Sequence, residues 1–171
     1  MHDEALVITL RAFLEEAPSA VLFAGAGVSA RAGLPTWKGY LEQLAELARV
    51  HDPMTRHHML ERIHDGDYLG AADLYFICKK LPQAQKYQNL VLPLRDFDAT
   101  ALAGLVSLPF SAMVTTNYDR ALITANAATN GCAAEEVNLH DTTLGAAPFN
   151  TRLYFARIHG RVESPETIQL S

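Results

Sequence analysis

Short, mostly apolar segments recur along the chain, and turn residues follow them. Residues 21–24 read Val-Leu-Phe-Ala and lead directly into Gly25, while residues 111–115 and 153–158 are similar segments. A shorter segment covers residues 137–139. Continuous apolar strands are typical of a parallel sheet that is covered on both faces. The pattern therefore predicts parallel strands at these segments, and residues 167–171 read as one more strand.

Between the first two predicted strands the hydrophobic pattern changes to a helical period. Apolar residues at three- and four-residue steps predict a helix over residues 3–16 and several helices from about 37 to 108. Another helix is expected over residues 119–129, where Asn130-Gly131 provides a C-terminal stop. We therefore expect an α/β fold with a Rossmann-like parallel sheet, in one domain over residues 1–171, with a helical insertion at about 38–108.

Composition and charge exclude several classes of protein. The 171 residues are 49% hydrophobic and 19% charged, and the net charge of −5 offers no basic face for nucleic acid. Two cysteines are too few for a disulfide framework or a four-cysteine zinc site. The longest run of apolar residues and glycine, 20–28, is too short for a membrane span, and the acidic start Met-His-Asp-Glu is unlike a signal peptide. We expect a cytoplasmic protein that binds neither a membrane nor nucleic acid directly.

A glycine-rich turn follows the first predicted strand. Gly25-Ala26-Gly27 would leave backbone N–H groups free to bind phosphate oxygens, although a tight strand-to-helix turn without a ligand has the same sequence. An ordinary Rossmann site also needs an acidic residue on a second strand about 20 residues later. That position falls here in the helical stretch near Glu42 and Glu46, so an ordinary Rossmann dinucleotide site is not predicted.

Polar residues also follow two later strands. The segment 111–115 leads into Thr116, Asn117, Tyr118 and Asp119, and the segment 153–158 leads into His159-Gly160. Ligands of open α/β sheets bind outside the carboxyl ends of the strands, where a histidine is a candidate general base. Alternatively, Asn117 and Asp119 only cap a helix, and His159 has a structural role.

In this order the three segments resemble motifs of the sirtuin family. Gly-Ala-Gly-Val-Ser at residues 25–29 and Gly-Leu-Pro-Thr-Trp at residues 33–37 are similar to its first NAD-binding motif. Thr-Thr-Asn-Tyr-Asp at residues 115–119 is similar to its Thr-Gln-Asn-Ile-Asp motif, and His159-Gly160 to its catalytic His-Gly. The resemblance covers about residues 19–171 and implies a sirtuin-type sheet, with the helical insertion where the family carries one.

Departures from the family pattern point to one branch of it. Thr116 replaces the family's glutamine, Thr36 its aspartate and Lys38 its arginine, and the chain has no Cys-x-x-Cys pair for the structural zinc. The chain is in this respect more similar to the zinc-free bacterial sirtuin-like proteins that hydrolyse NAD in defence against phage. The resemblance thus implies an NAD hydrolase that needs no metal.

The resemblance also implies roles for individual residues. Asn117 is expected to position the attacking water or the ribose hydroxyls, His159 to act as general base, and Asp119 to hold the nicotinamide carboxamide or brace its loop. Pro35 and Trp37 are expected to wall the nicotinamide pocket. The residues expected to bind the pyrophosphate of NAD are Gly25, Ala26, Gly27 and Ser29. Gly33, Thr115 and Thr116 are also expected to bind NAD.

Two other functions stay open at this point. One is a zinc-free, NAD-dependent protein deacylase, and the other is a module that senses a nucleotide or serves in assembly without catalysis. Because the family's sheet continues beyond the His-Gly, we expect the chain to be truncated at its C-terminus and weakly active or inactive alone. An exposed sheet edge would then favour association with a second copy or with a partner protein of a defence system.

Overall fold

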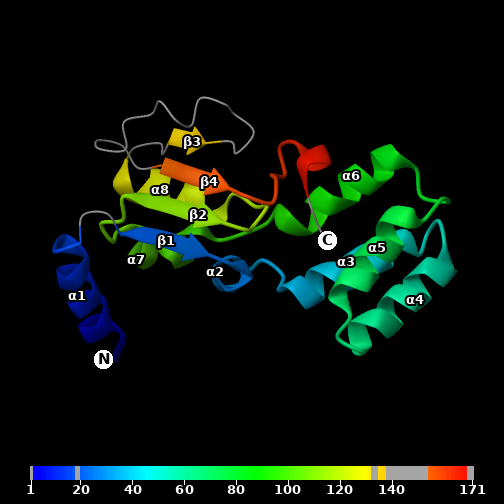
Figure 1. Ribbon diagram of the computed structural model, residues 1–171, viewed down its shortest axis with the longest axis horizontal. Helices are drawn as coiled ribbons and strands as arrows, with labels where there is room; N and C mark the ends of the chain where they lie inside the picture. The colour runs from blue at the N-terminus through cyan, green and yellow to red at the C-terminus, as the bar shows by residue number, and fades with distance from the viewer. Residues whose placement is uncertain (1, 18–19, 132–134, 138–153, 169–171) are drawn as a thin grey trace.

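The computed structural model describes residues 2–17, 20–131, 135–137 and 154–168 (Figure 1). Within these residues, parallel strands form one sheet in the order β1-β2-β4-β3. The strands are β1 (Val21–Ala24), β2 (Ala112–Thr115), β3 (Glu135–Val137) and β4 (Tyr154–Arg157). The predicted strands at 21–24, 111–115 and 153–158 are confirmed, although Ser111 and Ile158 lie just outside the observed strands and Leu153 lies outside the described ranges. Of the segment 137–139, Val137 ends β3 and the other two residues lie outside the described ranges.

Helices connect the strands and contribute to the same hydrophobic core. β1 leads into α2 (Ala26–Arg31), and β2 into α8 (Ala121–Asn130), which contacts α7 (Ala103–Val106). Buried Met113 and Phe155 of the sheet belong to one cluster with Ile123 of α8. α8 ends at Gly131 with a φ of 66°, which confirms the predicted stop. The predicted α/β class is therefore confirmed, and the parallel sheet is compatible with a Rossmann-like arrangement.

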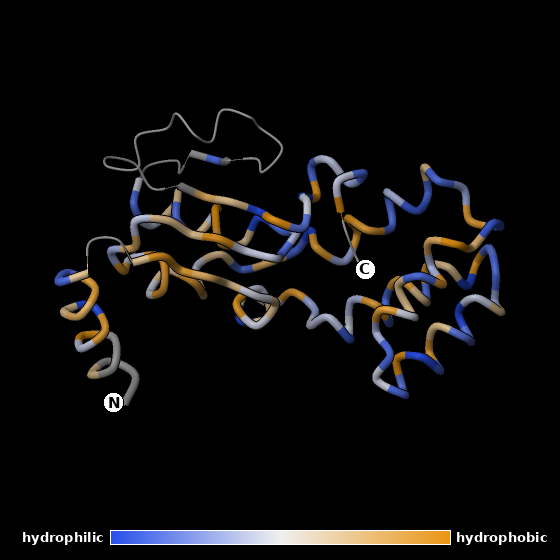
Figure 2. Tube along the Cα trace, viewed as in Figure 1, coloured by the Kyte–Doolittle hydropathy of each residue, from blue (hydrophilic) through white to orange (hydrophobic). Residues whose placement is uncertain are grey.

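A block of helices occupies the chain between β1 and β2 and lies toward one end of the molecule (Figure 1). Its helices are α3 (Trp37–Ala48), α4 (Pro53–His64), α5 (Tyr68–Ile77) and α6 (Gln83–Val91), and two 3-10 turns follow at Leu92–Leu94 and Ala99–Leu102. The side chains of Thr36, Asp52 and Asp67 accept hydrogen bonds from backbone N–H groups two or three residues later and start α3, α4 and α5. Figure 2 shows hydrophobic residues concentrated along the strands, whereas hydropathy alternates along this block.

The faces that these helices turn toward one another are apolar. α3 packs against both α4 and α5. The side chains of this contact that are fully buried are Leu41, Leu44, Ala45, Ala48, Met59, Ala71, Ala72 and Tyr75. In α3 they are the periodic stripe that predicted the helix, whereas in α5 Leu69 and Ile77 of the predicted stripe are exposed.

The expectation that the strands are covered on both faces is wrong at β1. Ala24 is buried, but Val21 is 53% exposed and Phe23 is 66% exposed. β1 lies at an edge of the described sheet, and successive side chains of a strand point to opposite faces. The described residues therefore leave one face of this apolar strand open to solvent.

The two ends of the described chain also differ from expectation. The first helix, α1 (His2–Glu15), forms as predicted. It stands apart from the sheet in Figure 1, and its Phe13 is 65% exposed, whereas Leu14 near its C-terminal end is buried. The predicted strand at 167–171 is wrong at Thr167, because Pro165–Thr167 form a 3-10 turn. Ile168 after that turn is buried, and residues 169–171 lie outside the described ranges.

Candidate functional site

The three motif-bearing strands end at the same level of the sheet. Ala24 of β1 pairs with Thr115 of β2, which pairs in turn with Arg157 of β4. Because these strands are parallel, Gly25, Thr116 and Ile158 leave the sheet together at its carboxyl edge, where open α/β sheets bind their ligands. The register thus brings together three segments that are separated by 91 and 42 residues in the sequence.

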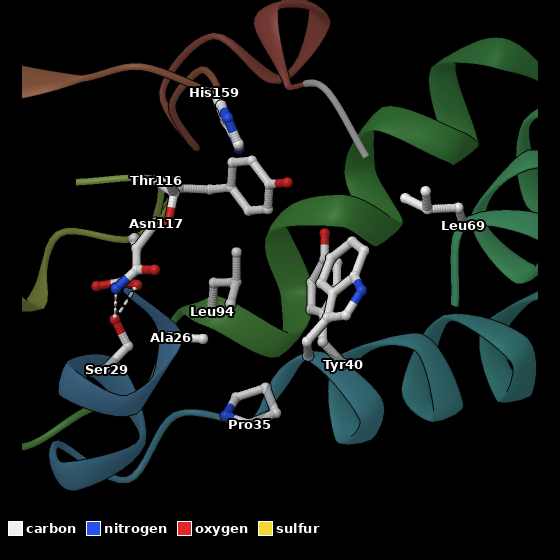
Figure 3. Close-up of a pocket in the computed structure, with 12 residues that line it drawn as sticks. Ala26, Ser29, Pro35, Tyr40, Leu69, Leu94, Thr116, Asn117 and His159 are labelled. Atoms are coloured by element: carbon white, nitrogen blue, oxygen red, sulfur yellow. Dashed lines mark hydrogen bonds between the residues drawn. The ribbon is translucent and has the colours of Figure 1, made fainter. Parts of the chain in front are cut away.

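A cavity of about 390 Å³ lies beside these strand ends, within the range of small-molecule sites. Figure 3 shows Asn117 and Ser29 on one side of it, His159 and Thr116 above, and Tyr40 and Leu69 across from them. Twelve of the residues that the structure describes line the cavity, and eight of them are among those expected from the sequence. These eight are Ala26, Ser29, Pro35, Trp37, Thr116, Asn117, Asp119 and His159.

Asn117 is tied to the turn after β1. Its Nδ2 donates hydrogen bonds to the carbonyl oxygen of Gly25 at 2.8 Å and to Ser29 Oγ at 2.7 Å. A carbonyl oxygen only accepts hydrogen bonds, so the amide nitrogen must occupy this position. The amide oxygen is thereby turned to the cavity side, as Figure 3 shows, and offers an acceptor to a ligand there.

Asp119 is buried, and the chain around it uses both of its carboxylate oxygens. Oδ2 accepts a hydrogen bond from Ser29 Oγ at 2.6 Å, and Oδ1 accepts one from the Ala121 N–H at 2.8 Å. Ser29 therefore bridges Asn117 and Asp119 and joins α2 to the loop after β2. Of the two roles expected for Asp119, this geometry provides the bracing of the loop.

The two threonines that begin the second motif have different surroundings. Thr115 is buried, donates from Oγ1 to the Ala24 carbonyl at 2.9 Å, and accepts from the Asn117 N–H at 3.0 Å. It therefore shapes the turn and lies outside the cavity lining. Thr116 lines the cavity, and its N–H donates to the Ala24 carbonyl at 3.3 Å.

His159 reaches the cavity from an exposed turn after β4. Gly160 follows with a φ of 99°, a conformation that favours glycine. A Cβ at Gly160 would lie 2.2 Å from the backbone oxygen of Thr167. The His-Gly pair thus combines a titratable side chain at the cavity with a backbone contact that leaves no room for a side chain.

An aromatic wall, which we define as Trp37, Tyr40 and Tyr118, lines the cavity. The Trp37 and Tyr40 rings stack with centroids 5.8 Å apart, and the Tyr40 and Tyr118 rings lie 6.3 Å apart. Burial raises the pKa of Tyr118 to about 12, and burial together with the neighbouring Tyr118 raises the pKa of Tyr40. The Tyr40 hydroxyl donates to the Leu90 carbonyl at 2.9 Å, which fixes this ring between two helices.

The three glycines of the first motif lie outside the lining of this cavity. Gly25 contributes its carbonyl to the Asn117 contact. Gly27 is exposed, and a Cβ built there would meet no atom within 4 Å. Gly33 has a φ of 89° just after α2, so its role in the structure is to end that helix.

Sequence reasoning missed four of the residues that line the cavity. They are Tyr40, Leu69, Leu94 and Tyr118. Tyr118 lies between two expected residues, and Tyr40 follows Trp37 by three positions on one helix face, so both could have been found from spacing. Leu69 and Leu94 come from the helical block, and no motif marks them.

Comparison with known proteins adds no family assignment: no protein-family model matches the chain, and no curated protein matches it. The part of the chain that the structure describes contains no group of three or more His, Cys, Asp or Glu side chains that would hold a metal ion. None of the described helices is long and apolar enough to cross a membrane.

Proposed function

We propose that this chain binds NAD and hydrolyses its nicotinamide–ribose bond, releasing nicotinamide and ADP-ribose. One observation carries the proposal: the glycine-rich turn, the Asn117 loop and His159, which are distant in sequence, meet at a single cavity at the carboxyl edge of a parallel sheet. A sirtuin-type arrangement of the sheet belongs to the same proposal, because it rests on the same motifs.

The character of the cavity suits the nicotinamide end of NAD. Among the described residues no lysine or arginine lines it, and Asp119 and His159 are the only carboxylate and imidazole side chains in that lining. The nicotinamide ring of NAD is cationic, and the faces of aromatic rings such as Trp37 attract cations. The anionic pyrophosphate would instead lie outside the cavity, along the exposed backbone at Gly27.

The chemistry requires one bond to break and one to form. As the bond between ribose C1′ and the nicotinamide nitrogen breaks, its electron pair leaves with nicotinamide and C1′ develops oxocarbenium character. A water oxygen bonds to C1′, and His159 accepts the proton that this water loses. The Asn117 amide oxygen accepts a hydrogen bond from that water or from a ribose hydroxyl, while Ser29 and Asp119 hold the Asn117 loop in place.

Product analysis tests this proposal. Purified protein, or its full-length parent, is incubated with NAD, and nicotinamide and ADP-ribose are quantified by chromatography. We expect both products in equal amounts. His159→Ala should lose about 10²- to 10⁴-fold, the usual contribution of a general base, and Asn117→Ala about 10²-fold, the usual cost of a misplaced reacting group. Gln88→Ala on the exposed face of α6 is the matched control and should keep full activity. Full activity in both site variants would overturn the assigned roles.

A nucleotide-sensing module without catalysis is the second candidate. It is favoured by the engagement of the Asn117 amide nitrogen and both Asp119 oxygens with protein atoms, which leaves few side-chain groups for chemistry. Saturable NAD binding by calorimetry with no product after prolonged incubation would support this candidate over the hydrolase. An acyl-lysine peptide in the same assay separates hydrolysis from the deacylase alternative.

The proposed biological setting is the bacterial cytoplasm, with the domain acting as an effector of anti-phage defence. Association with a second copy or with a partner protein belongs to this proposal. It is supported by exposed Val21 and Phe23 on the edge strand β1, since such edges tend to pair. Light scattering tests for the homo-oligomer, and a monomer at every concentration would contradict it.

A further inference from the structure

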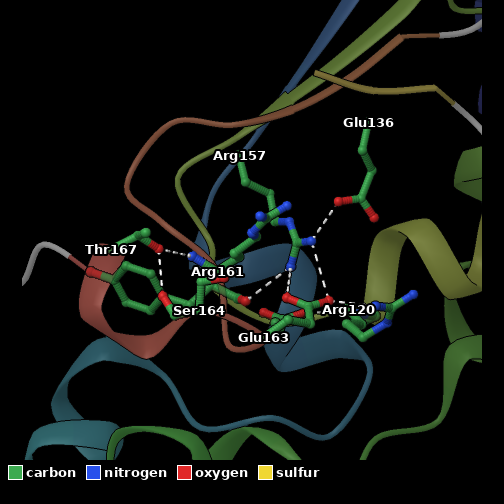
Figure 4. Close-up of polar contacts among 10 residues, drawn as sticks. Arg120, Glu136, Arg157, Arg161, Glu163, Ser164 and Thr167 are labelled. Carbon is green, nitrogen blue, oxygen red and sulfur yellow. Dashed lines mark hydrogen bonds and ion pairs between the residues drawn. The ribbon is translucent and has the colours of Figure 1, made fainter. Parts of the chain in front are cut away.

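A buried arginine lies at the end of β4, next to the turn that carries His159. The Arg157 side chain is only 4% exposed. Its Nη1 and Nη2 atoms bind the two carboxylate oxygens of Glu163 at 2.7 and 3.2 Å, and Nη2 also binds Glu136 at 2.7 Å. Arg120 pairs with the same Glu163 carboxylate, as Figure 4 shows. We call these four residues the Arg157 cluster.

The Arg157 cluster closes the loop that presents His159. Arg157 and Glu163 lie on either side of His159-Gly160, so their paired hydrogen bonds join the two ends of this short loop. The loop is also fixed to the Asn117 motif. The Tyr118 carbonyl accepts hydrogen bonds from the Val162 N–H at 3.0 Å and from Arg157 Nη1 at 3.4 Å.

His159 depends on this loop for its position. Among the described residues no side chain or backbone group makes a hydrogen bond to its imidazole, and the residue is exposed. The backbone of residues 158–162 therefore sets where the ring lies relative to Asn117. Burying an arginine is costly unless charged partners compensate, and here Glu163 and Glu136 supply those partners.

From these contacts we propose that Arg157 and Glu163 are positioning residues of the candidate site, which hold the loop of residues 158–162 so that His159 stays at the cavity. Neither residue lines the cavity, so both act through His159. The expected effect of Arg157 and Glu163 on the rate of NAD hydrolysis rests on the proposed function, whereas their expected effect on the position of the His159 ring does not.

Steady-state kinetics give the first test. Glu163→Gln keeps the shape of the side chain and removes the charge that pairs with Arg157, and Arg157→Lys keeps the charge and removes the two-pronged contact. A displacement of about 1 Å in a reacting group costs about 10²-fold in rate. We expect kcat for NAD hydrolysis to fall by about that factor in Glu163→Gln and by less in Arg157→Lys, with KM changed less than kcat. The double variant should fall no further than the worse single variant.

Imidazole NMR gives the second test and needs no activity. The His159 signals are assigned by their absence in His159→Gln, and they should shift in Glu163→Gln while the signals of His57 and His64 in α4 stay in place. Arg56→Gln, which breaks the Arg56–Glu46 pair between α4 and α3, is the matched control and should change neither kcat nor the His159 signals.

The two tests separate the two proposals. Shifted His159 signals together with a lower kcat support the positioning role. Unchanged His159 signals in both Glu163→Gln and Arg157→Lys overturn it, whatever the kinetics show. A wild-type protein without NAD hydrolysis counts against the proposed function alone, and the NMR result then decides the positioning role by itself.

Discussion

Gly160 shows how a single residue without a side chain determines the geometry beside the cavity. Its φ of 99° and its approach to the Thr167 backbone both exclude a Cβ. A glycine after His159 permits close approach of a ligand or of neighbouring backbone. In the structure the approaching group is the backbone of Thr167, which belongs to the 3-10 turn Pro165–Thr167.

Replacing Gly160 with alanine should therefore weaken both fold and function. We expect Gly160→Ala to lower the free energy of unfolding by about 1–3 kcal/mol, the usual cost of a strained backbone position. NAD hydrolysis should fall further than stability explains, because the relaxing backbone moves His159. Urea unfolding measures the first effect, with Gly104→Ala as the control, since an added Cβ there meets no atom within 4 Å. Equal stability of the two variants would contradict this account of Gly160.

The charge on Glu163 predicts a pH dependence. Burial alone would raise the pKa of Glu163. The hydrogen bond from Arg157 and the positive charges of Arg157 and Arg120 outweigh burial and lower this pKa. A carboxyl whose pKa is lower in the folded state stabilises that state above its ordinary pKa of about 4.3. The stabilisation is lost as the pH falls through the lowered pKa.

Glu163→Gln should consequently differ from wild type only where the carboxyl is ionised. We expect the variant to be less stable than wild type at about pH 7 and the difference to shrink or vanish at about pH 3. Urea unfolding at both pH values measures this. A difference that stays the same at acidic pH would mean that the Arg157 cluster does not stabilise the fold through this charge.

At the scale of elements, local pattern was sufficient for most of the fold. The apolar strands, the helical periodicity of the block and the Gly131 stop are properties of neighbouring residues, so the sequence predicted them. Exposure was not predictable in this way. Val21 and Phe23 read as buried strand residues, but β1 lies at a sheet edge, and strand order depends on contacts between distant segments.

The first turn of α2, which follows β1 directly, gives a prediction at this scale. Gly27 lies within α2, has open space where a Cβ would be, and faces solvent. Gly27→Ala should leave the free energy of unfolding unchanged or raise it by about 0.5–1 kcal/mol, since alanine favours a helix over glycine. If the pyrophosphate approaches this backbone, the same variant should bind NAD more weakly. Unchanged NAD affinity by calorimetry would remove Gly27 from the proposed binding site.

At the scale of the whole molecule, the sequence predicted the meeting of the three motifs but not the complete cavity. Parallel strands bring their carboxyl ends to one edge, so Asn117 and His159 were expected near Gly25. The opposite wall comes from the helical block, where Tyr40 and Leu69 reach the cavity through packing that no motif encodes. The Arg157 cluster was missed for the same reason, because its ion pairs join segments on four different parts of the fold.

The most direct test of the central claim is a crystal structure of His159→Ala grown with NAD, a variant chosen so that the nucleotide persists. The account predicts the nicotinamide ring in the cavity between Asn117 and the aromatic wall, with the pyrophosphate along the backbone of residues 25–27. A nucleotide bound elsewhere on the molecule, or no bound nucleotide at saturating concentration, would contradict the account.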